Sequence, residues 1–198
     1  MEKELIEQNK EDFINILTSN VNREGVDKFI EWLEKSDFFT APASTKYHLS
    51  EEGGLCQHSL NVYERLEKLM ITEYGEDGYN KESVALCGLL HDICKANYYK
   101  VDYRNVKNED GVWVKQPYYT VDDQLPYGHG EKSVYIINGF IRLTREEAIA
   151  INWHMGGFDT RVQGGSIDYN KAYNKYPLAI LTHIADLEAT FLDESEIN

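Results

Sequence analysis

The chain has 198 residues, of which 42% are hydrophobic and 12% aromatic, and this composition excludes a disordered protein and favours a folded domain with a sizeable core. Its formal net charge of −14 argues against long nucleic acid as a partner, because proteins bind the phosphate backbone with patches of Lys and Arg. A small anionic substrate stays compatible with this charge, since bound metal ions can dominate the field inside a site.

The sequence indicates neither a membrane anchor nor a secretion signal. Its longest apolar run, at residues 84–90, is far shorter than the roughly 20 residues that span a bilayer, and the N-terminal sequence MEKELIEQNK is charged. Cys56, Cys87 and Cys94 form no CxxC pair, so we expect reduced core cysteines rather than disulfides, a zinc site or a catalytic thiol. We therefore expect a cytoplasmic protein with no membrane partner, whose oligomeric state is left open.

Helices are expected in the first half of the chain. Apolar residues at helical spacing predict two packing helices at about 2–18 and 23–35. A proline and a Gly-Gly pair indicate a loop over residues 38–54. Further helices are predicted over 55–74 and 81–95, each with a continuous apolar stripe.

The middle of the chain changes to an alternation of period two. The sequences YYKVDYRNV and VWVKQPYYTV flank the turn-rich residues 108–111, which predicts a β-hairpin at about 97–123. It is rich in tyrosine and is expected beside the cleft, where its rings either stack on a substrate or pack across the strands. This hairpin is the one β element that the sequence predicts.

Helices return after the hairpin. They are predicted over 130–143, over 144–154 with a Thr-x-x-Glu capping box, and from residue 171 or 177 to about 192. The acidic residues 193–196 are expected to be frayed and solvated.

The predicted fold class is therefore all-α, a helical bundle with an inserted hairpin. We expect a single domain over residues 1–198, in which residues 1–50 form N-terminal helices and a loop, and residues 53–192 form the functional core.

Histidine and aspartate residues recur on the apolar stripes of the predicted helices or beside glycine turns. The set is His58, His91, Asp92, His129, His154 and Asp186. Imidazole binds transition metals, and a carboxylate can neutralise and bridge them, whereas both groups are costly to bury without a partner. Any one of these histidines alone is better explained as a core or helix-end residue, but together they predict a buried metal centre.

This order of ligands resembles the signature of the HD-domain superfamily. The resemblance covers about residues 53–189 and is carried by GGLCQHSLNV, LLHDICK, GHGEKS, INWHMG and LTHIADLEA. It implies an all-helical, metal-dependent fold, whose members are mostly phosphohydrolases or phosphodiesterases that act on nucleotides, cyclic nucleotides or nucleic acid ends.

The ligand set has two further histidines between the HD pair and the last aspartate, and in this the chain resembles the members of the superfamily that bind two divalent ions. By resemblance, His58, His91, Asp92 and Asp186 hold the first ion, and His129 and His154 hold the second, with Asp92 bridging. The candidate metals are Fe, Mn, Co, Ni, Zn and Mg. Ions that share Asp92 lower the pKa of a bound water and so provide a hydroxide for attack on phosphorus.

Other residues are candidates for binding the substrate. Lys95 completes an HD-x-x-K pattern and is either a phosphate-binding charge or an ordinary lysine at a helix end. His48 lies in a loop that either covers the cleft or is solvated. Arg161 is a candidate phosphate clamp or a solvated loop charge, and Tyr99 belongs to the tyrosine-rich hairpin. His183 shares a helix face with Asp186 and is expected to orient a ligand or to pack.

The leading hypothesis is a metal-dependent phosphohydrolase with Asp92 and Lys95 in catalytic roles and a small phosphorylated substrate, first of all a nucleotide. The same ligand order also resembles the di-iron oxygenases typified by myo-inositol oxygenase. A third reading is an HD-type nuclease, which the acidic charge disfavours. A ligand sensor with a degenerate site is the fourth, and the complete ligand set argues against it.

Overall fold

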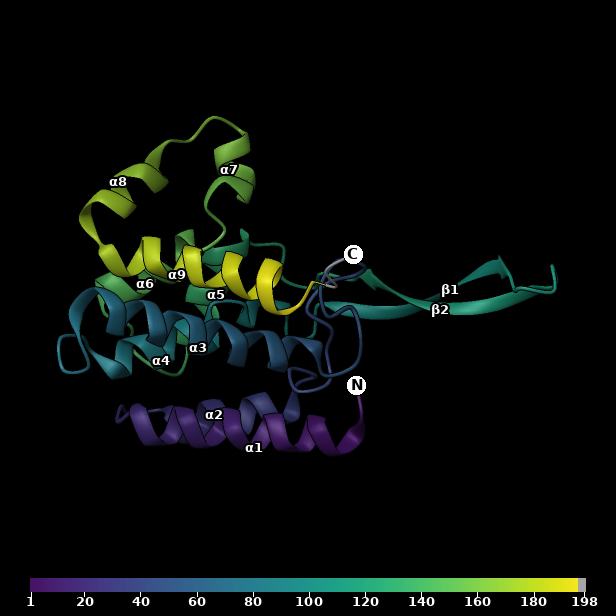
Figure 1. Ribbon diagram of the computed structural model, residues 1–198, viewed down its shortest axis with the longest axis horizontal. Helices are drawn as coiled ribbons and strands as arrows, with labels where there is room; N and C mark the ends of the chain where they lie inside the picture. Colours follow the sequence, from purple (N-terminus) through teal and green to yellow (C-terminus); the bar gives the residue numbers. More distant parts are fainter. Residues whose placement is uncertain (196–198) are drawn as a thin grey trace.

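Helices form the body of the protein, and one hairpin extends from it (Figure 1). The computed structural model describes residues 1–195. Its helices are α1 (Lys3–Asn20), α2 (Val26–Lys35), α3 (Gly54–Tyr74), α4 (Lys81–Leu90), α5 (His129–Asn138), α6 (Arg145–Trp153), α7 (Thr160–Gln163), α8 (Asp168–Lys175) and α9 (Pro177–Glu188). Short 3₁₀ turns, η1 (Ile93–Lys95) and η2 (Gly156–Phe158), and a π-helical turn, η3 (Ala189–Asp193), complete the helical part. The predicted all-α class with an inserted hairpin is confirmed.

The helices pack in layers around one hydrophobic core. In Figure 1, α1 and α2 lie on one side of α3 and α4, and α9 lies on the other side with α5 and α6. The core contains fully buried side chains from several of these helices, among them Phe13, Leu66, Leu89 and Ile151. Complete burial of such a side chain is worth roughly 2 kcal/mol, so this core holds the ends of α3, α4, α6 and α9 in place around the residues described below.

Two predicted helices are shorter than expected, and one of them, the helix expected over 130–143, ends at Asn138. The helix expected over 81–95 ends at Leu90, and Asp92 has a non-helical backbone at φ −104° and ψ 18°. This break turns His91 and Asp92 toward the same site, whereas adjacent residues of a regular helix point about 100° apart. The last helix, α9, begins at Pro177, the second of its two predicted starts, because the ring fits the first turn of a helix but not the interior of a longer one.

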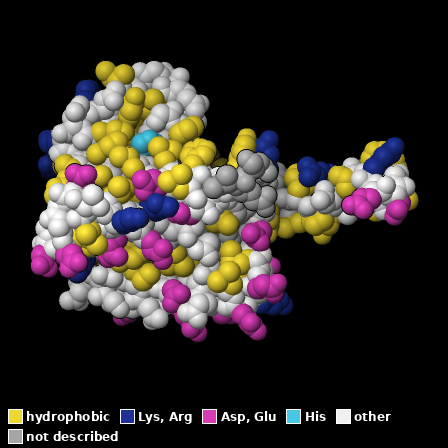
Figure 2. Space-filling view, in the orientation of Figure 1, with side chains coloured by type: hydrophobic (Ala, Val, Ile, Leu, Met, Phe, Trp, Pro, Cys, Tyr) yellow, Lys and Arg dark blue, Asp and Glu magenta, His cyan; other side chains and the backbone are white. Residues whose placement is uncertain are grey.

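The hairpin consists of β1 (Tyr99–Lys107) and β2 (Trp113–Val121), which pair antiparallel from Tyr99 opposite Val121 to Lys107 opposite Trp113. Most of its side chains are exposed, including Tyr103 and Trp113. Figure 2 shows hydrophobic and basic side chains along it, with acidic ones at its tip and across the visible face of the body. No helix within residues 1–195 is long and apolar enough to cross a membrane.

Candidate metal centre

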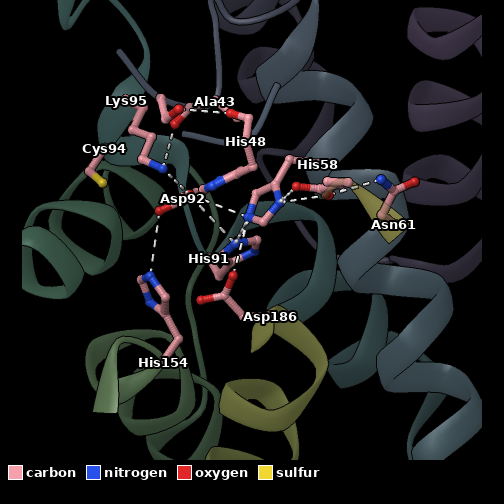
Figure 3. A network of polar contacts seen from close by, with 12 residues as sticks. Ala43, His48, His58, Asn61, His91, Asp92, Cys94, Lys95, His154 and Asp186 are labelled. Atoms are coloured by element: carbon pink, nitrogen blue, oxygen red, sulfur yellow. Dashed lines mark hydrogen bonds and ion pairs between the residues drawn. The ribbon is translucent and has the colours of Figure 1, made fainter. Parts of the chain in front are cut away.

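The six predicted ligands come together from five parts of the fold. His58 lies inside α3, His91 follows α4 and Asp92 comes next, His129 begins α5, His154 follows α6, and Asp186 lies on α9. Figure 3 shows how those that it labels point toward one another. His58, His91 and His154 are no more than 1% exposed, and Asp92 is 3% exposed. This degree of burial for imidazole and carboxylate groups requires strong partners.

Asp92 is the centre of the cluster, and its two oxygen atoms face two different groups of ligands. Oδ1 lies 2.7 Å from Nε2 of His129 and 3.4 Å from Nε2 of His154. Oδ2 lies 3.7 Å from Nε2 of both His58 and His91. Asp186 joins the second group, with Oδ1 3.3 Å from Nε2 of His58. The carboxylate of Asp92 therefore lies between two sets of nitrogen atoms.

Hydrogen bonds at the outer nitrogen atoms orient the imidazole rings. Nδ1 of His91 donates to the carbonyl of Gly88 at 2.9 Å, and Nδ1 of His154 donates to the carbonyl of Ile151 at 2.7 Å. Because a carbonyl oxygen only accepts, both Nδ1 atoms carry a hydrogen, and a neutral ring then presents the lone pair of Nε2 to the centre.

This arrangement fits a bound cation. Nε2 of His154 is buried and has no hydrogen-bond partner among residues 1–195. Nε2 of His91 lies 3.2 Å from Nε2 of His58, so two ring nitrogens face each other inside the protein. Converging imidazole nitrogens and carboxylate oxygens are the ligands of a divalent transition metal. The described residues therefore fit the ion that the ligand inventory predicts.

The protonation of the two facing rings differs. Burial lowers the pKa of His58, but the hydrogen bonds with Asp186 and Glu194 outweigh it and raise the pKa to about 10. Burial lowers the pKa of His91 to about 4. At neutral pH the ring of His58 is therefore protonated on both nitrogens, whereas the ring of His91 is neutral and keeps its hydrogen on Nδ1 only. A metal cation between them replaces the proton on Nε2 of His58, so metal binding and protonation compete.

Two glycines allow the helices that carry the histidines to approach closely. A Cβ atom on Gly130 would lie 2.2 Å from the carbonyl oxygen of Asn152, so only glycine lets α5 approach α6 and bring His129 beside His154. Gly156 has φ +51°, and a Cβ atom there would meet the ring of His183 at 2.5 Å. Nδ1 of His183 contacts the carbonyl of His154, in keeping with the orienting role that the sequence suggested.

Lys95 extends the cluster toward solvent. Its Nζ lies 2.7 Å from Oδ2 of Asp92 and donates to the carbonyl of Ala43 at 2.8 Å. Burial lowers the pKa of Lys95, but the charge of Asp92 outweighs it and holds the pKa above its usual value. Lys95 therefore provides a fixed positive charge beside Asp92.

A cavity of about 750 Å³ opens onto this cluster. Its polar wall contains Asp92, Lys95, His129 and Asp186. The wall also contains the apolar or aromatic side chains of Tyr47, Met155, Phe158, Leu187 and Phe191. A larger cavity of about 1030 Å³ lies among α2, α5 and α6, but it contains none of the six predicted ligands. Of these two cavities, the smaller one is therefore the candidate substrate site, because the predicted metal ligands line it.

The structure brings His48 to the cavity and keeps Tyr99 behind it. His48 lines the cavity, its ring centroid lies 5.0 Å from that of His58, and its Nε2 has no hydrogen-bond partner within residues 1–195. The hydroxyl of Tyr99 donates to the carbonyl of Ala43, which also accepts from Lys95. Tyr99 therefore supports the loop that holds Lys95, and it does not line the cavity.

Arg161 does not lie where a phosphate clamp is expected. Its guanidinium is 2.6 Å from both Glu131 and Asp159, and it stacks over the ring of Trp153 at 3.9 Å. Two carboxylates compensate its charge, so Arg161 connects α5 to the loop after α6. The sequence could not reveal this, because Glu131 lies thirty residues earlier in the chain.

The expectation of a solvated acidic tail is wrong for Glu194, whereas Asp193 and Ser195 are exposed as expected. Asp193 pairs with Arg65, and the side chain of Glu194 is only 1% exposed against His58. Glu196 lies outside the described residues. Sequence reasoning missed Glu194 because its partner is 136 residues away and an acidic run ordinarily indicates a solvated segment.

The fold and the cluster define a class: a helical protein with buried histidine and aspartate ligands suited to a divalent metal. The family model of the HD domain matches residues 55–190, more than half of the chain. The protein belongs to the HD-domain family, within a superfamily of metal-dependent hydrolases. None of the curated proteins and none of the solved structures compared with the chain matches it.

Proposed function

We propose that the protein is a metal-dependent phosphohydrolase that cleaves a phosphomonoester or phosphodiester bond of a small substrate, with a nucleotide as the first candidate. The observation that carries this proposal is the position of Asp92, whose two oxygens face two sets of nitrogen ligands. Carboxylates that bridge two ions are typical of phosphoryl-transfer sites with two metals.

The chain's own residues supply the framework of this reaction. Oδ2 of Asp92, with His58, His91 and Asp186, is suited to one ion, and Oδ1, with His129 and His154, is suited to a second. When bound, such ions provide the Lewis acidity that turns water into a nucleophile at neutral pH and that offsets charge on the phosphoryl group.

The cavity supports a substrate with one polar and one apolar part. Lys95 fixes a positive charge beside Asp92 on the cavity wall, which suits a phosphoryl oxygen. Phe158, Phe191 and Tyr47 line the same space and offer aromatic faces for a nucleobase or a similar ring. A volume of about 750 Å³ is within the range for a small-molecule site.

The test is a substrate screen with protein loaded with Mn²⁺, Co²⁺ or Fe²⁺. Nucleoside mono-, di-, tri- and cyclic phosphates are incubated with it, and released phosphate and nucleosides are measured, with Asp92→Ala as the control. We expect hydrolysis of at least one class, lost in the control. Metal-replete protein that is inactive on every phosphoester would refute the proposal, and oxygen consumption by the iron-loaded protein would then favour a di-iron oxygenase.

A further inference from the structure

The chain segment that follows α9 reaches back to α3 and enters the candidate metal centre. Oε1 of Glu194 accepts a hydrogen bond from Nδ1 of His58 at 2.9 Å and another from Nδ2 of Asn61 at 2.9 Å. The preceding carboxylate, that of Asp193, pairs with Arg65 on the same face of α3. Figure 3 shows Asn61 beside His58, on the side away from the other ligands.

The π-helical turn η3 brings Glu194 to this position. The backbone N–H of Glu194 donates to the carbonyl of Ala189, five residues earlier, instead of four as in an α-helix. The extra residue in this turn changes the direction in which the following side chain points. Such π turns are often found at functional sites.

His58 needs this carboxylate because of where it lies on its helix. His91 and His154 follow the ends of α4 and α6, where free carbonyls three residues earlier accept from Nδ1. His58 lies inside α3, where the preceding carbonyls already accept the helical hydrogen bonds. Glu194 supplies the acceptor that the helix itself cannot provide.

The burial of Glu194 points to the same role. Its side chain is 1% exposed although it belongs to an acidic surface segment. A buried carboxylate costs several kcal/mol unless charged or polar partners compensate it. Its described partners are the ring of His58 and the amide of Asn61. Both of its oxygens contact Nδ1 of His58, so the imidazole is the main partner that stabilises the buried carboxylate.

We propose that Glu194 is a positioning residue for His58: it holds the hydrogen on Nδ1 and directs Nε2 to the metal centre, so that the C-terminal segment sets the affinity for the ion that His58 binds. This role rests on the proposed function, because it requires that His58 binds metal. Carboxylates that hold a ligand histidine in this way typically change metal affinity by about 10- to 100-fold.

The test compares metal affinity in variants of the full chain. Binding of Co²⁺ is titrated by its visible absorption, and Mn²⁺ content is measured after dialysis. Glu194→Ala should weaken binding by about 10- to 100-fold. Glu194→Gln should restore most of the affinity, because its amide oxygen still accepts from Nδ1. The matched control Asp193→Ala alters the same segment without touching a histidine and should keep the affinity of the wild type.

A second measurement does not depend on how the variants fold. In zinc-loaded wild-type protein labelled with ¹⁵N, the histidine ring spectrum should show His58 with its hydrogen on Nδ1. Coordination through Nδ1 would overturn the proposal, as would equal affinities of Glu194→Ala and the wild type, or an equal loss in Asp193→Ala. Wild-type protein that binds no metal would instead overturn the proposed function.

Discussion

Nε2 of His58 and Nε2 of His91 lie 3.2 Å apart inside the protein, and the Nδ1 atom of each ring contacts an oxygen on its outer side. The two inner nitrogens can share a proton or a metal ion, but two bare lone pairs at this distance repel each other. A proton or a metal ion must therefore lie between these two nitrogens in the folded protein. Because the folded state binds this cation, the stability of the protein depends on the available metal.

Metal binding should therefore raise the thermal stability. A ligand that binds only the folded state at 100 times its Kd stabilises by about 2.7 kcal/mol. We expect the melting temperature, measured by scanning calorimetry, to fall after treatment with a chelator and to recover on addition of Mn²⁺ or Zn²⁺. An unchanged melting temperature, with bound metal verified by elemental analysis, would contradict this link.

Substitution of Asp92 should have a larger effect on metal content than substitution of Asp186. Asp92 contacts both sets of ligands, whereas Asp186 belongs to the set of His58 and His91. We expect Asp92→Ala to lose both ions and Asp186→Ala to keep part of the metal, as measured by mass spectrometry of the purified proteins. Full metal content in Asp92→Ala would show that this residue does not bridge.

Lys95→Met should separate catalysis from metal binding. Lys95 faces the cavity beside Asp92 but offers no lone pair while it is protonated. We expect unchanged metal content and a fall in kcat/KM of about 100-fold, the typical cost of losing one charge-stabilising donor. Lys100→Met on the exposed hairpin is the control and should keep full activity. Equal activities of the two variants would exclude a role of Lys95 in the reaction.

A buried ion pair far from the centre should make stability depend on pH. Glu147 is fully buried and accepts from Arg23, Ser83 and the backbone of Thr144. Burial raises the pKa of Glu147, but the hydrogen bonds from Arg23 and Ser83 outweigh it and lower the pKa below its ordinary value of 4.5. The pair therefore stabilises above about pH 4.5, and this contribution is lost as the pH falls through the lower folded-state pKa.

Arg23→Met tests this pair. At pH 7 it should reduce the free energy of unfolding by about 3 kcal/mol, because it leaves a buried carboxylate without its partner. The difference from the wild type, measured by urea denaturation, should shrink below pH 4.5 as the carboxylate is protonated. Lys35→Met, which removes an exposed pair with Glu31, should change little at either pH. A pH-independent difference would contradict the assignment.

Two neighbouring glycines should respond differently to alanine. Gly156 has φ +51° and a Cβ there would meet His183, whereas a Cβ on Gly157 would meet no described atom within 4 Å. Gly156→Ala should lower the free energy of unfolding by at least about 1 kcal/mol, from backbone strain alone. It should also weaken metal binding, because His183 contacts the carbonyl of His154. Gly157→Ala should match the wild type in both measurements, and equal behaviour of the two variants would contradict the packing described.

Features that depend on nearby residues could be predicted from the sequence. Helical spacing, the capping box at Thr144 and Glu147, and the turn between β1 and β2 are local signals, and the structure contains all three. Features that depend on distant partners could not be predicted. Glu194 meets a histidine from the other half of the chain, and Arg161 meets a carboxylate on another helix. The end of α4 at Leu90 also depends on tertiary demands, because the apolar pattern continues past it.

The hairpin lies in the chain between Asp92 and His129, and as an isolated two-stranded sheet it gains little stability of its own. Its turn at residues 108–111 is exposed and is a natural point for a protease to cut. A cut there would divide the ligands equally, leaving three on each fragment: His58, His91 and Asp92 on one, and His129, His154 and Asp186 on the other. The metal centre would then connect two separate polypeptides that share the packing of α3 and α4 against α6 and α9, and chelation would weaken their association.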